Sequence, residues 1–265
     1  MKLCLVTLLG LLCAGAARAA VHTEKIRYKH DGKELEGYLA YDDAIKEKRP
    51  GVLVVHEWTG HNRYVQKRAR QLARLGYVAF ALDMYGKGVL AKSPQEAAKL
   101  AAPFKEDRKM MRERATAGLN VLRKQSQVDT KRLAAIGYCF GGTTVLELAR
   151  SGADLAGVVS FHGDLSSPNP DDAKNIKAKV LALHGADDPF VPDKVVAAFE
   201  KEMRDGGVDW ELVKYGNAVH SFTNPDAGND NKKGAAYNAK ADQRSWEAMK
   251  TFFDEIFKKS RRSSQ

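Results

Sequence analysis

Residues 133–150, LAAIGYCFGGTTVLELAR, decide the fold. The apolar run at 133–136 is typical of a strand buried on both faces of a parallel sheet, and a helical pattern begins at Gly142. Between them, residues 137–141 place a cysteine between glycines in a strand-to-helix turn. In such a tight turn, side chains two positions either side of the central residue would collide with neighbouring elements. The stretch therefore predicts a nucleophile elbow with Cys139 at its tip.

Apolar runs alternate with helical patterns on both sides of this stretch. Two short strands, joined by an Asp-Gly pair typical of a hairpin, open the chain at 25–29 and 35–41. Further strand-like runs stand at 52–55, 78–82, 157–161, 180–183 and 210–215, with helical patterns at 62–75 and 94–123. A last helix carries apolar residues at helical spacing, namely Trp246, Met249, Phe253, Ile256 and Phe257. This order predicts a doubly wound, mostly parallel sheet with helices on both faces.

The first nineteen residues have the pattern of a secretory signal peptide. Lys2 precedes an uncharged, leucine-rich stretch at 3–17, and small residues at Ala17 and Ala19 occupy the two positions that a signal peptidase reads. This stretch is shorter than the roughly 20 apolar residues that a membrane-spanning helix needs. We therefore expect cleavage after Ala19, export to the periplasm or the medium without stable membrane insertion, and one domain at 20–265.

Cleavage would leave a single cysteine in the mature chain, because Cys4 and Cys13 lie in the segment expected to be removed. An exported protein that keeps one oxidisable thiol at Cys139 fits a catalytic nucleophile. The alternatives are a buried inert thiol, which the elbow pattern argues against, and a thiol redox sensor, for which the mature chain has no resolving cysteine.

Basic residues exceed acidic ones without forming a stripe. The formal net charge is +10, and removal of Lys2 and Arg18 would lower it to +8. A mild concentration of basic residues at 258–262 is typical of a solvated chain end. We therefore expect no nucleic-acid partner. We also expect a monomer that acts on a small-molecule substrate, and the positive charge of the protein would attract anionic substrates.

An acid and a base should follow the elbow, in that order along the chain. Asp187 and Asp188 follow the run at 180–183, and either could orient an imidazole or cap the helix that starts near Asp193. His220 follows the next predicted strand and is the candidate base. The other histidines, which show no metal-ligand spacing, are His22, His30, His56, His61, His162 and His184. We therefore expect neither a metal nor an organic cofactor.

Five motifs, in order, resemble the dienelactone hydrolase family over nearly the whole mature chain. They are His56-Glu57-Trp58, Asp83-Met84-Tyr85, GYCFGG at 137–142, DPFVP at 188–192 and His220-Ser221-Phe222. The resemblance implies an α/β-hydrolase fold and cleavage of a small ester or lactone. It also implies that Cys139 is the nucleophile, that His220 is the base, and that Asp188 rather than Asp187 is the acid.

The resemblance implies two supporting features as well. Glu57 would contact the resting thiol and move when substrate binds, so that the thiolate forms only then; a surface carboxylate is the alternative. The backbone N–H groups of Trp58 and Phe140 would bind the oxyanion, one from the loop after an early strand and one from the residue after the nucleophile.

The expected substrate-binding residues depart from the family pattern. These expected residues are Tyr85, Lys87 and Asn224. Members that cleave dienelactone hold its carboxylate with two arginines, whereas this sequence has Lys87 and Asn224 at those positions. Lysine keeps the charge without a planar bidentate grip, and asparagine supplies no charge. We therefore expect weak turnover of dienelactone unless Arg108 or Arg112 compensates. A general carboxylesterase or thioesterase for uncharged esters is the alternative, and a non-catalytic binding protein that kept the fold is a further one.

Overall fold

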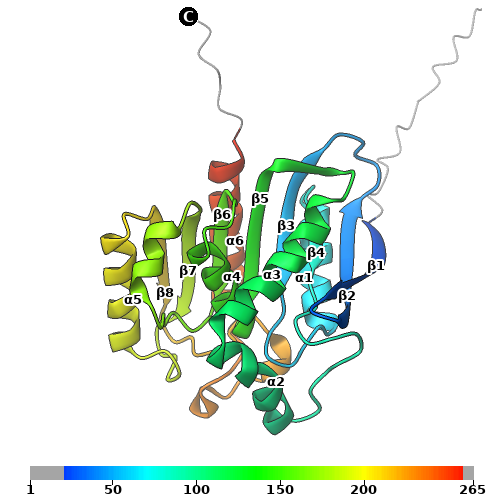
Figure 1. Ribbon diagram of the computed structural model, residues 1–265. Helices are drawn as coiled ribbons and strands as arrows, with labels where there is room; N and C mark the ends of the chain where they lie inside the picture. Colours follow the sequence, from blue (N-terminus) through cyan, green and yellow to red (C-terminus); the bar gives the residue numbers. More distant parts are fainter. Residues whose placement is uncertain (1–20, 259–265) are drawn as a thin grey trace, which may run out of the picture.

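The computed structural model describes residues 21–258, which form an eight-stranded sheet with helices on both faces (Figure 1). The strands are β1 (Val21–His30), β2 (Lys33–Asp42), β3 (Arg49–Val55), β4 (Val78–Ala81), β5 (Val128–Tyr138), β6 (Gly157–Phe161), β7 (Lys179–Gly185) and β8 (Trp210–Tyr215). The helices are α1 (Arg63–Arg74), α2 (Pro94–Glu106), α3 (Arg108–Arg123), α4 (Phe140–Arg150), α5 (Asp193–Asp205) and α6 (Ala239–Phe257). Three 3₁₀ helices are η1 (Pro170–Asn175), η2 (Pro225–Ala227) and η3 (Asn231–Lys233). The predicted signal segment, residues 1–19, lies outside the described residues.

The strand order of the sheet is β1-β2-β4-β3-β5-β6-β7-β8. The pairs β1–β2 and β2–β4 are antiparallel, and the pairs from β4 through β8 are parallel. The central parallel strands are continuous apolar runs because helices cover both of their faces. The predicted doubly wound, mostly parallel sheet of an α/β-hydrolase is therefore confirmed.

The order of the strands reverses at β3. From β3 the chain passes through α1 to β4 on one side, and then through α2 and α3 to β5 on the other side. Open α/β sheets bind ligands where the carboxyl ends of two such strands diverge. His56 follows β3 directly and Cys139 follows β5, so the two motifs reach the same edge of the sheet.

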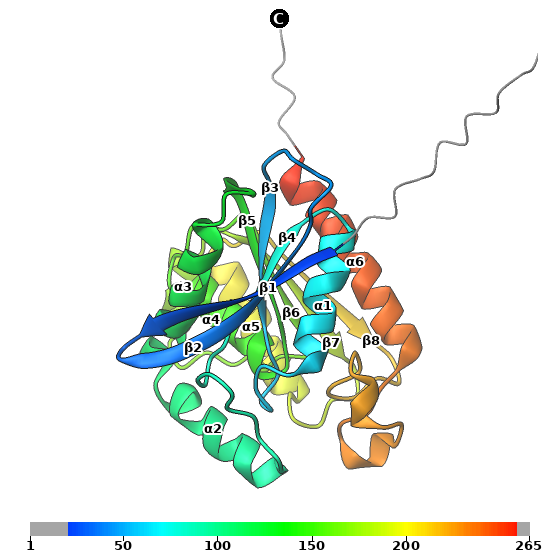
Figure 2. The ribbon, with the colours of Figure 1, turned by 90° about the vertical axis from the view of Figure 1, so that its right-hand side faces the viewer.

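Two apolar cores lie on opposite faces of the sheet. Figure 2 shows α1 and α6 on one face and α3, α4 and α5 on the other. Met249, Phe253 and Phe257 of α6 are buried in the core on the face that α1 and α6 cover, and Trp246 and Ile256 pack at the margin of this core. Full burial of each large apolar side chain contributes about 1.5–3 kcal/mol. The apolar stripe of the last helix is therefore core packing.

The N-terminal hairpin is longer than its apolar pattern predicts. β1 and β2 pair from Val21 opposite Asp42 to His30 opposite Lys33. At the turn, Asp31 has a φ of 51° and Gly32 one of 68°, which matches the two positive φ angles of a type I′ hairpin turn. The pairing extends past the apolar positions because main-chain hydrogen bonds do not depend on which side chains the strands carry.

The helical pattern at 94–123 is divided into two helices at Asp107. The backbone of Asp107 is extended, with a φ of −114° and a ψ of 91°, and its side chain accepts a hydrogen bond from the N–H of Met110. This residue therefore ends α2 and caps α3. Figure 1 shows α2 at the same end of the sheet as the segment between β8 and α6.

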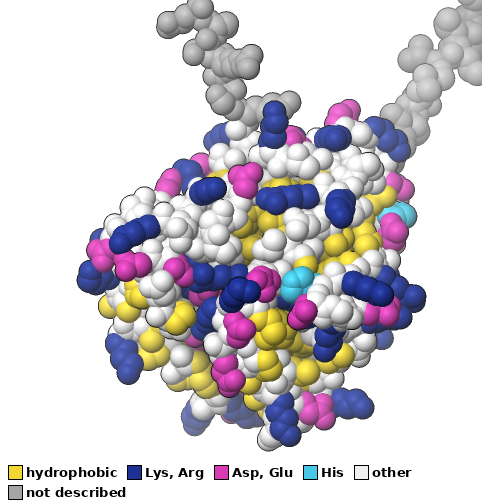
Figure 3. Space-filling model, viewed as in Figure 1, with side chains coloured by type: hydrophobic (Ala, Val, Ile, Leu, Met, Phe, Trp, Pro, Cys, Tyr) yellow, Lys and Arg dark blue, Asp and Glu magenta, His cyan; other side chains and the backbone are white. Residues whose placement is uncertain are grey.

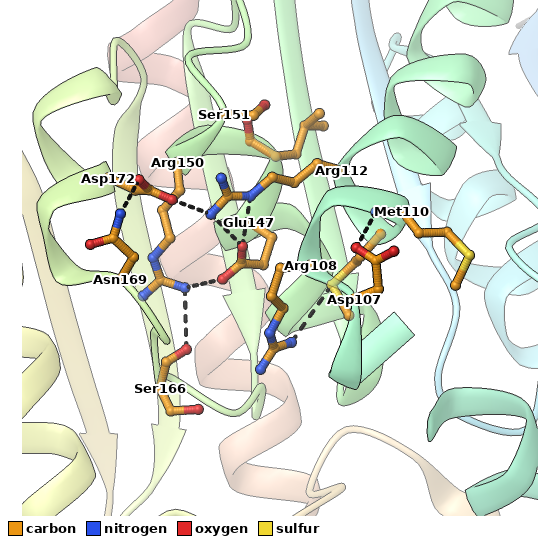
Figure 4. Close-up of polar contacts among 12 residues, drawn as sticks. Asp107, Arg108, Met110, Arg112, Glu147, Arg150, Ser151, Ser166, Asn169 and Asp172 are labelled. Atoms are coloured by element: carbon orange, nitrogen blue, oxygen red, sulfur yellow. Dashed lines mark hydrogen bonds and ion pairs between the residues drawn. The ribbon is translucent and has the colours of Figure 1, made fainter. Parts of the chain in front are cut away.

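Helix α4, which follows Cys139, is held by a cluster of buried charges (Figure 4). The fully buried guanidinium of Arg150 donates to Glu147 at 3.0 Å and to both carboxylate oxygens of Glu202 at 2.8 Å. Arg112 of α3 lies 2.7 Å from Glu147 and 2.6 Å from Asp172. The cluster therefore ties the helix behind the elbow to α3, η1 and α5.

The described surface mixes charges of both signs. Figure 3 shows lysine and arginine side chains scattered among acidic ones over the visible face, without a continuous stripe. Of the helices between residues 21 and 258, none combines the length and apolar character that crossing a membrane requires.

Candidate active site

Cys139 stands in a strained turn between β5 and α4. Its φ of 53° and ψ of −116° lie outside the regions that most residues adopt. A Cβ on Gly137 would come within 1.9 Å of the carbonyl oxygen of Gly141, and one on Gly141 within 2.3 Å of the carbonyl oxygen of Val55. Glycine is therefore required on both sides of the cysteine, as the elbow pattern predicts.

The side chains of Cys139, His220 and Asp188 form a continuous chain of contacts. The Cys139 Sγ lies 3.1 Å from His220 Nε2, and His220 Nδ1 lies 2.8 Å from Asp188 Oδ2. Three loops beyond the strands β5, β7 and β8 bring these residues together. The arrangement places a thiol, an imidazole and a carboxylate in the order of a nucleophile, a base and an orienting acid.

The structure distinguishes the two adjacent aspartates. The Asp188 carboxylate is buried and also accepts a hydrogen bond at 2.9 Å from the N–H of Phe190. Asp187 is exposed, and its side chain makes no hydrogen bond to any residue in 21–258. Neither residue caps the following helix, because the N-cap of α5 is Pro192. Asp188 is thus the aspartate that contacts the imidazole.

Charges around His220 favour its protonated form. Burial by itself would lower the pKa of His220, but the sulfur of Cys139 and the carboxylate of Asp188 outweigh this cost and raise the pKa to about 10. The N-terminus of α4 carries the positive end of the helix dipole, which stabilises a thiolate at Cys139. His220 is therefore protonated at neutral pH, beside the sulfur of Cys139.

A second histidine, which the sequence did not single out, supports the elbow. The N–H of Cys139 is shared between the carbonyl oxygen of Phe161, at 3.0 Å, and Nδ1 of His162, at 3.1 Å. Because Nδ1 accepts from this N–H, we assign the ring proton to Nε2, which lies 2.7 Å from Thr223 Oγ1. Burial holds the pKa of His162 well below its usual value. Its position directly after the apolar run at 157–161 was the available signal.

Glu57 is buried at the site but makes no hydrogen bond to the thiol of Cys139. Its carboxylate accepts a hydrogen bond at 2.6 Å from Asn224 Nδ2, whereas the thiol of Cys139 contacts His220. Burial raises the pKa of Glu57 to about 7, although the Asn224 hydrogen bond and the charges of His220 and Arg68 oppose the rise. The surface-carboxylate alternative for Glu57 is wrong, because the residue is buried, and its carboxylate is hydrogen-bonded to Asn224 rather than to the resting thiol.

Cys139 and His220 open into a cavity of about 440 Å³. The apolar residues that line it are Trp58, Phe140, Phe190, Val191 and Ala235, and the polar ones are Lys105, Thr143, Asp164, Ser221 and Lys233. The ring of Phe190 is 60% exposed and lies edge-on to His220, with centroids 5.5 Å apart. The sequence did not indicate that Lys105 and Lys233 belong to the site, because exposed lysines are common in helices and loops.

The three predicted substrate-binding residues do not line this cavity. Tyr85 is buried behind it and donates a hydrogen bond at 3.0 Å to the carbonyl oxygen of Trp58. Lys87 pairs with Glu34 of β2 at 3.3 Å, and the amide of Asn224 is turned towards Glu57. The polar groups of all three residues are therefore bonded within the protein. The expectation that these residues contact the substrate directly is corrected accordingly. The suggested substitute Arg112 is likewise held in the buried cluster, and Arg108 contacts Met111.

The two expected oxyanion donors border the cavity. In the described part of the chain, the backbone N–H groups of Trp58 and Phe140 have no hydrogen-bond partner. For Phe140 this follows from its place in the first turn of α4, where N–H groups have no acceptor within the helix. Both groups are therefore available to an oxygen beside Cys139. No cluster of three potential metal ligands occurs among residues 21–258.

Comparison with known proteins points to one family. The family model described as "Dienelactone hydrolase family" matches residues 35–257. The solved structure named m3DLH is 44% identical with a TM-score of 0.86, and covers 90% of this chain and 99% of its own. A crystal structure of a dienelactone hydrolase-like promiscuous phosphotriesterase from metagenomic libraries is 42% identical with the same TM-score of 0.86, and covers 89% and 99%. A Yersinia pestis relative with the provisional name carboxymethylenebutenolidase is 27% identical over 244 residues, 88% of each chain. The chain therefore belongs to the dienelactone hydrolase family.

Proposed function

We propose that this protein hydrolyses a small ester or lactone through a covalent intermediate on Cys139. The observation that carries the proposal is the contact chain from the Cys139 Sγ through His220 to Asp188, at 3.1 Å and 2.8 Å, which opens into the cavity. Membership of the dienelactone hydrolase family supports carboxylic ester hydrolysis, and the carboxymethylenebutenolidase name of a relative supports lactones.

The proposed reaction has two halves. The thiolate of Cys139 attacks the carbonyl carbon, and the backbone N–H groups of Trp58 and Phe140 bind the oxygen that becomes negative. As the tetrahedral intermediate collapses, the C–O bond breaks and the His220 imidazolium gives its proton to the leaving alcohol. Neutral His220 then removes a proton from water, which attacks the thioester and releases the acid and the thiolate.

The cavity supports a substrate with an apolar body and room for a negative charge. Trp58, Phe140 and Phe190 supply apolar wall, and a volume of about 440 Å³ suits a small molecule. Lys105 and Lys233 also line the cavity and would attract a carboxylate, although as point charges rather than bidentate clamps. Uncharged esters remain the alternative substrate class, and the relative described as a phosphotriesterase adds phosphotriesters to those worth testing.

A substrate panel with a nucleophile-free variant tests the proposal. We expect wild-type protein to cleave short esters or lactones, and Cys139→Ala to lower kcat/KM by at least about a thousandfold. The panel compares neutral esters, carboxylate-bearing esters, dienelactone, thioesters and a phosphotriester. We expect the variant to fold, because Cys139 is half-buried and alanine is small, and circular dichroism checks this.

Two outcomes would decide against covalent hydrolysis at this residue. Equal turnover by wild type and Cys139→Ala would exclude the cysteine as the nucleophile. Sulfenic acid formation at Cys139 under mild oxidant, in a protein that cleaves nothing in the panel, would favour the redox-sensor alternative.

Glu57→Gln is expected to increase the reactivity of Cys139 at alkaline pH only. Burial raises the pKa of Glu57 to about 7, so its carboxyl is neutral well below that pH and charged above it. A charged Glu57 disfavours negative charge on the sulfur in the same site, and its removal should raise the alkylation rate up to about tenfold. Below about pH 6 the two rates should coincide, because Glu57 is then already neutral.

The measurement is the iodoacetamide rate of Cys139 against pH in wild type, Glu57→Gln and the control Asp187→Asn. Asp187 is exposed, so its variant should follow the wild-type profile. Identical profiles for all three proteins would show that Glu57 does not influence the thiol.

Export stays a prediction, since residues 1–19 lie outside the described part of the chain. It is supported by the signal pattern before Ala20. An intact mass that retains Met1 in exported protein would contradict cleavage at that site.

A further inference from the structure

His56 is a buried histidine that takes no chemical part in the proposed reaction. It follows β3 directly, is fully buried, and packs against Tyr85 and Phe140 with ring centroids 4.9 Å and 6.1 Å away. Its Nδ1 lies 2.6 Å from the carbonyl oxygen of Glu57, and its Nε2 lies 3.2 Å from the N–H of Met84. Both ring nitrogens are therefore occupied by backbone groups.

These two contacts assign the proton on the ring. Because the N–H of Met84 can only donate, Nε2 must accept, and the proton is on Nδ1, from which it is donated to the Glu57 carbonyl. Burial lowers the pKa of His56 to about 4, so the neutral ring persists through the neutral pH range. His56 is thus a fixed hydrogen-bond donor to one peptide group.

That peptide group also contains the N–H of Trp58. In a planar trans peptide the C=O and the N–H point in opposite directions. The Glu57 carbonyl is held by His56 and by the N–H of Gly60, at 3.1 Å, so the Trp58 N–H must point away from both. Within residues 21–258 this N–H has no acceptor, and Trp58 borders the cavity that contains Cys139.

We propose that His56 is a positioning residue for the oxyanion hole: its Nδ1–H fixes the Glu57–Trp58 peptide so that the Trp58 N–H faces the attacked carbonyl. This inference rests on the proposed function, because it requires an oxyanion to form at Cys139. The next peptide is held as well, since the Tyr85 hydroxyl donates at 3.0 Å to the Trp58 carbonyl. The His56 ring also stacks on the side chain of Phe140, the residue whose backbone N–H is the second expected oxyanion donor.

Two polar substitutions of His56 test the hydrogen-bond donor at Nδ1 separately from the acceptor at Nε2. In His56→Asn the side-chain amide lies at the δ position and still reaches the Glu57 carbonyl, whereas in His56→Gln it lies one bond further, near Met84. We expect His56→Gln to lower kcat about ten- to a hundredfold with little change in KM, since one oxyanion donor is misplaced. His56→Asn should stay within about threefold of wild type.

Two probes of Cys139 distinguish positioning from general damage. Iodoacetamide alkylates the thiolate without forming an oxyanion, so its rate should be the same in wild type and His56→Gln. A trifluoromethyl ketone forms a tetrahedral adduct in which the sulfur bonds to the carbonyl carbon and the oxygen becomes negative, so its affinity should fall in parallel with kcat. The matched control is His61→Leu, which removes a hydrogen bond to the Ala81 carbonyl from the same loop and should leave all three quantities unchanged.

The results separate this inference from the proposed function. Equal kcat in wild type and His56→Gln, or a loss in a folded His56→Asn as large as in His56→Gln, would overturn the role of the Nδ1 donor. A parallel fall in the iodoacetamide rate would overturn it too, because the thiol itself would then be affected. If His56→Gln does not fold, a folded His56→Asn with normal kcat and ketone affinity supports the inference, and a slow one overturns it. Failure of the wild type to cleave any ester would instead overturn the proposed function.

Discussion

Asp188→Asn is expected to lower kcat/KM about a hundred- to ten-thousandfold, whereas Asp187→Asn should change it less than about twofold. The Asp188 carboxylate accepts the hydrogen bond from His220 Nδ1 at 2.8 Å, which keeps Nε2 directed at the sulfur. An asparagine can present its N–H₂ to Nδ1 and so favour the wrong tautomer. The exposed Asp187 has no such contact.

The same substitution should move the pH profile. The charge of Asp188 helps to raise the pKa of His220 to about 10, so its loss lowers that pKa. A histidine whose pKa falls loses its proton at a lower pH, and the imidazolium–thiolate pair is then lost at a lower pH as well. The alkaline limb of kcat/KM should therefore move towards neutrality in Asp188→Asn and not in Asp187→Asn.

Steady-state kinetics of both variants between about pH 5 and pH 10 check these expectations. Equal losses at the two positions would mean that His220 is oriented by another group. A large loss in Asp188→Asn with an unmoved alkaline limb would mean that the carboxylate fixes the geometry of the imidazole but not its charge.

Arg150→Met is expected to destabilise the fold by about 3–5 kcal/mol. Its guanidinium is fully buried and pairs with Glu147 at 3.0 Å and with Glu202 at 2.8 Å, and these carboxylates are themselves buried. Removing the arginine leaves the Glu202 carboxylate without a positive partner among the described residues, while Glu147 keeps Arg112. An unpaired buried charge costs far more than a lost surface contact.

Urea unfolding of Arg150→Met at neutral pH gives the change in the free energy of unfolding. Lys109→Met is the matched control, because Lys109 pairs with Glu113 on the exposed face of α3 and its loss should leave the midpoint unchanged. A double variant, Arg150→Met with Glu202→Gln, should recover part of the loss, since it removes the stranded charge. A midpoint for Arg150→Met equal to that of Lys109→Met would show that the cluster does not stabilise the fold.

The sequence by itself was sufficient for the features that depend on local pattern. Apolar runs between helical patterns predicted the parallel sheet, and the Asp-Gly pair at 31–32 predicted the hairpin turn. The spacing of glycines around Cys139 predicted the strained elbow, because a tight strand-to-helix turn leaves no room for a Cβ at Gly137 or Gly141. Order along the chain also brought His220 into consideration as the partner of Cys139.

Tertiary structure decided where the side chains point. Asp187 and Asp188 are adjacent and chemically identical, and only the loop conformation turns one towards His220 and the other to solvent. Glu57 and Asn224 are far apart in sequence, so their 2.6 Å contact depends on how the loops after β3 and β8 meet.

The cavity and the buried charges were equally beyond the sequence. Lys105 and Lys233 look like ordinary surface lysines until α2 and the segment before α6 bring both of them to the lining of the same cavity. Arg150 and Glu202 look like solvated helix residues, although α4 and α5 bury them against each other. The sequence determined which backbone elements form and in what order, because local sterics and apolar periodicity act over short spans of chain. Which polar groups meet was decided only by the packing of distant elements, since an unpaired buried polar group is costly and its partner must come from whichever element the fold brings near.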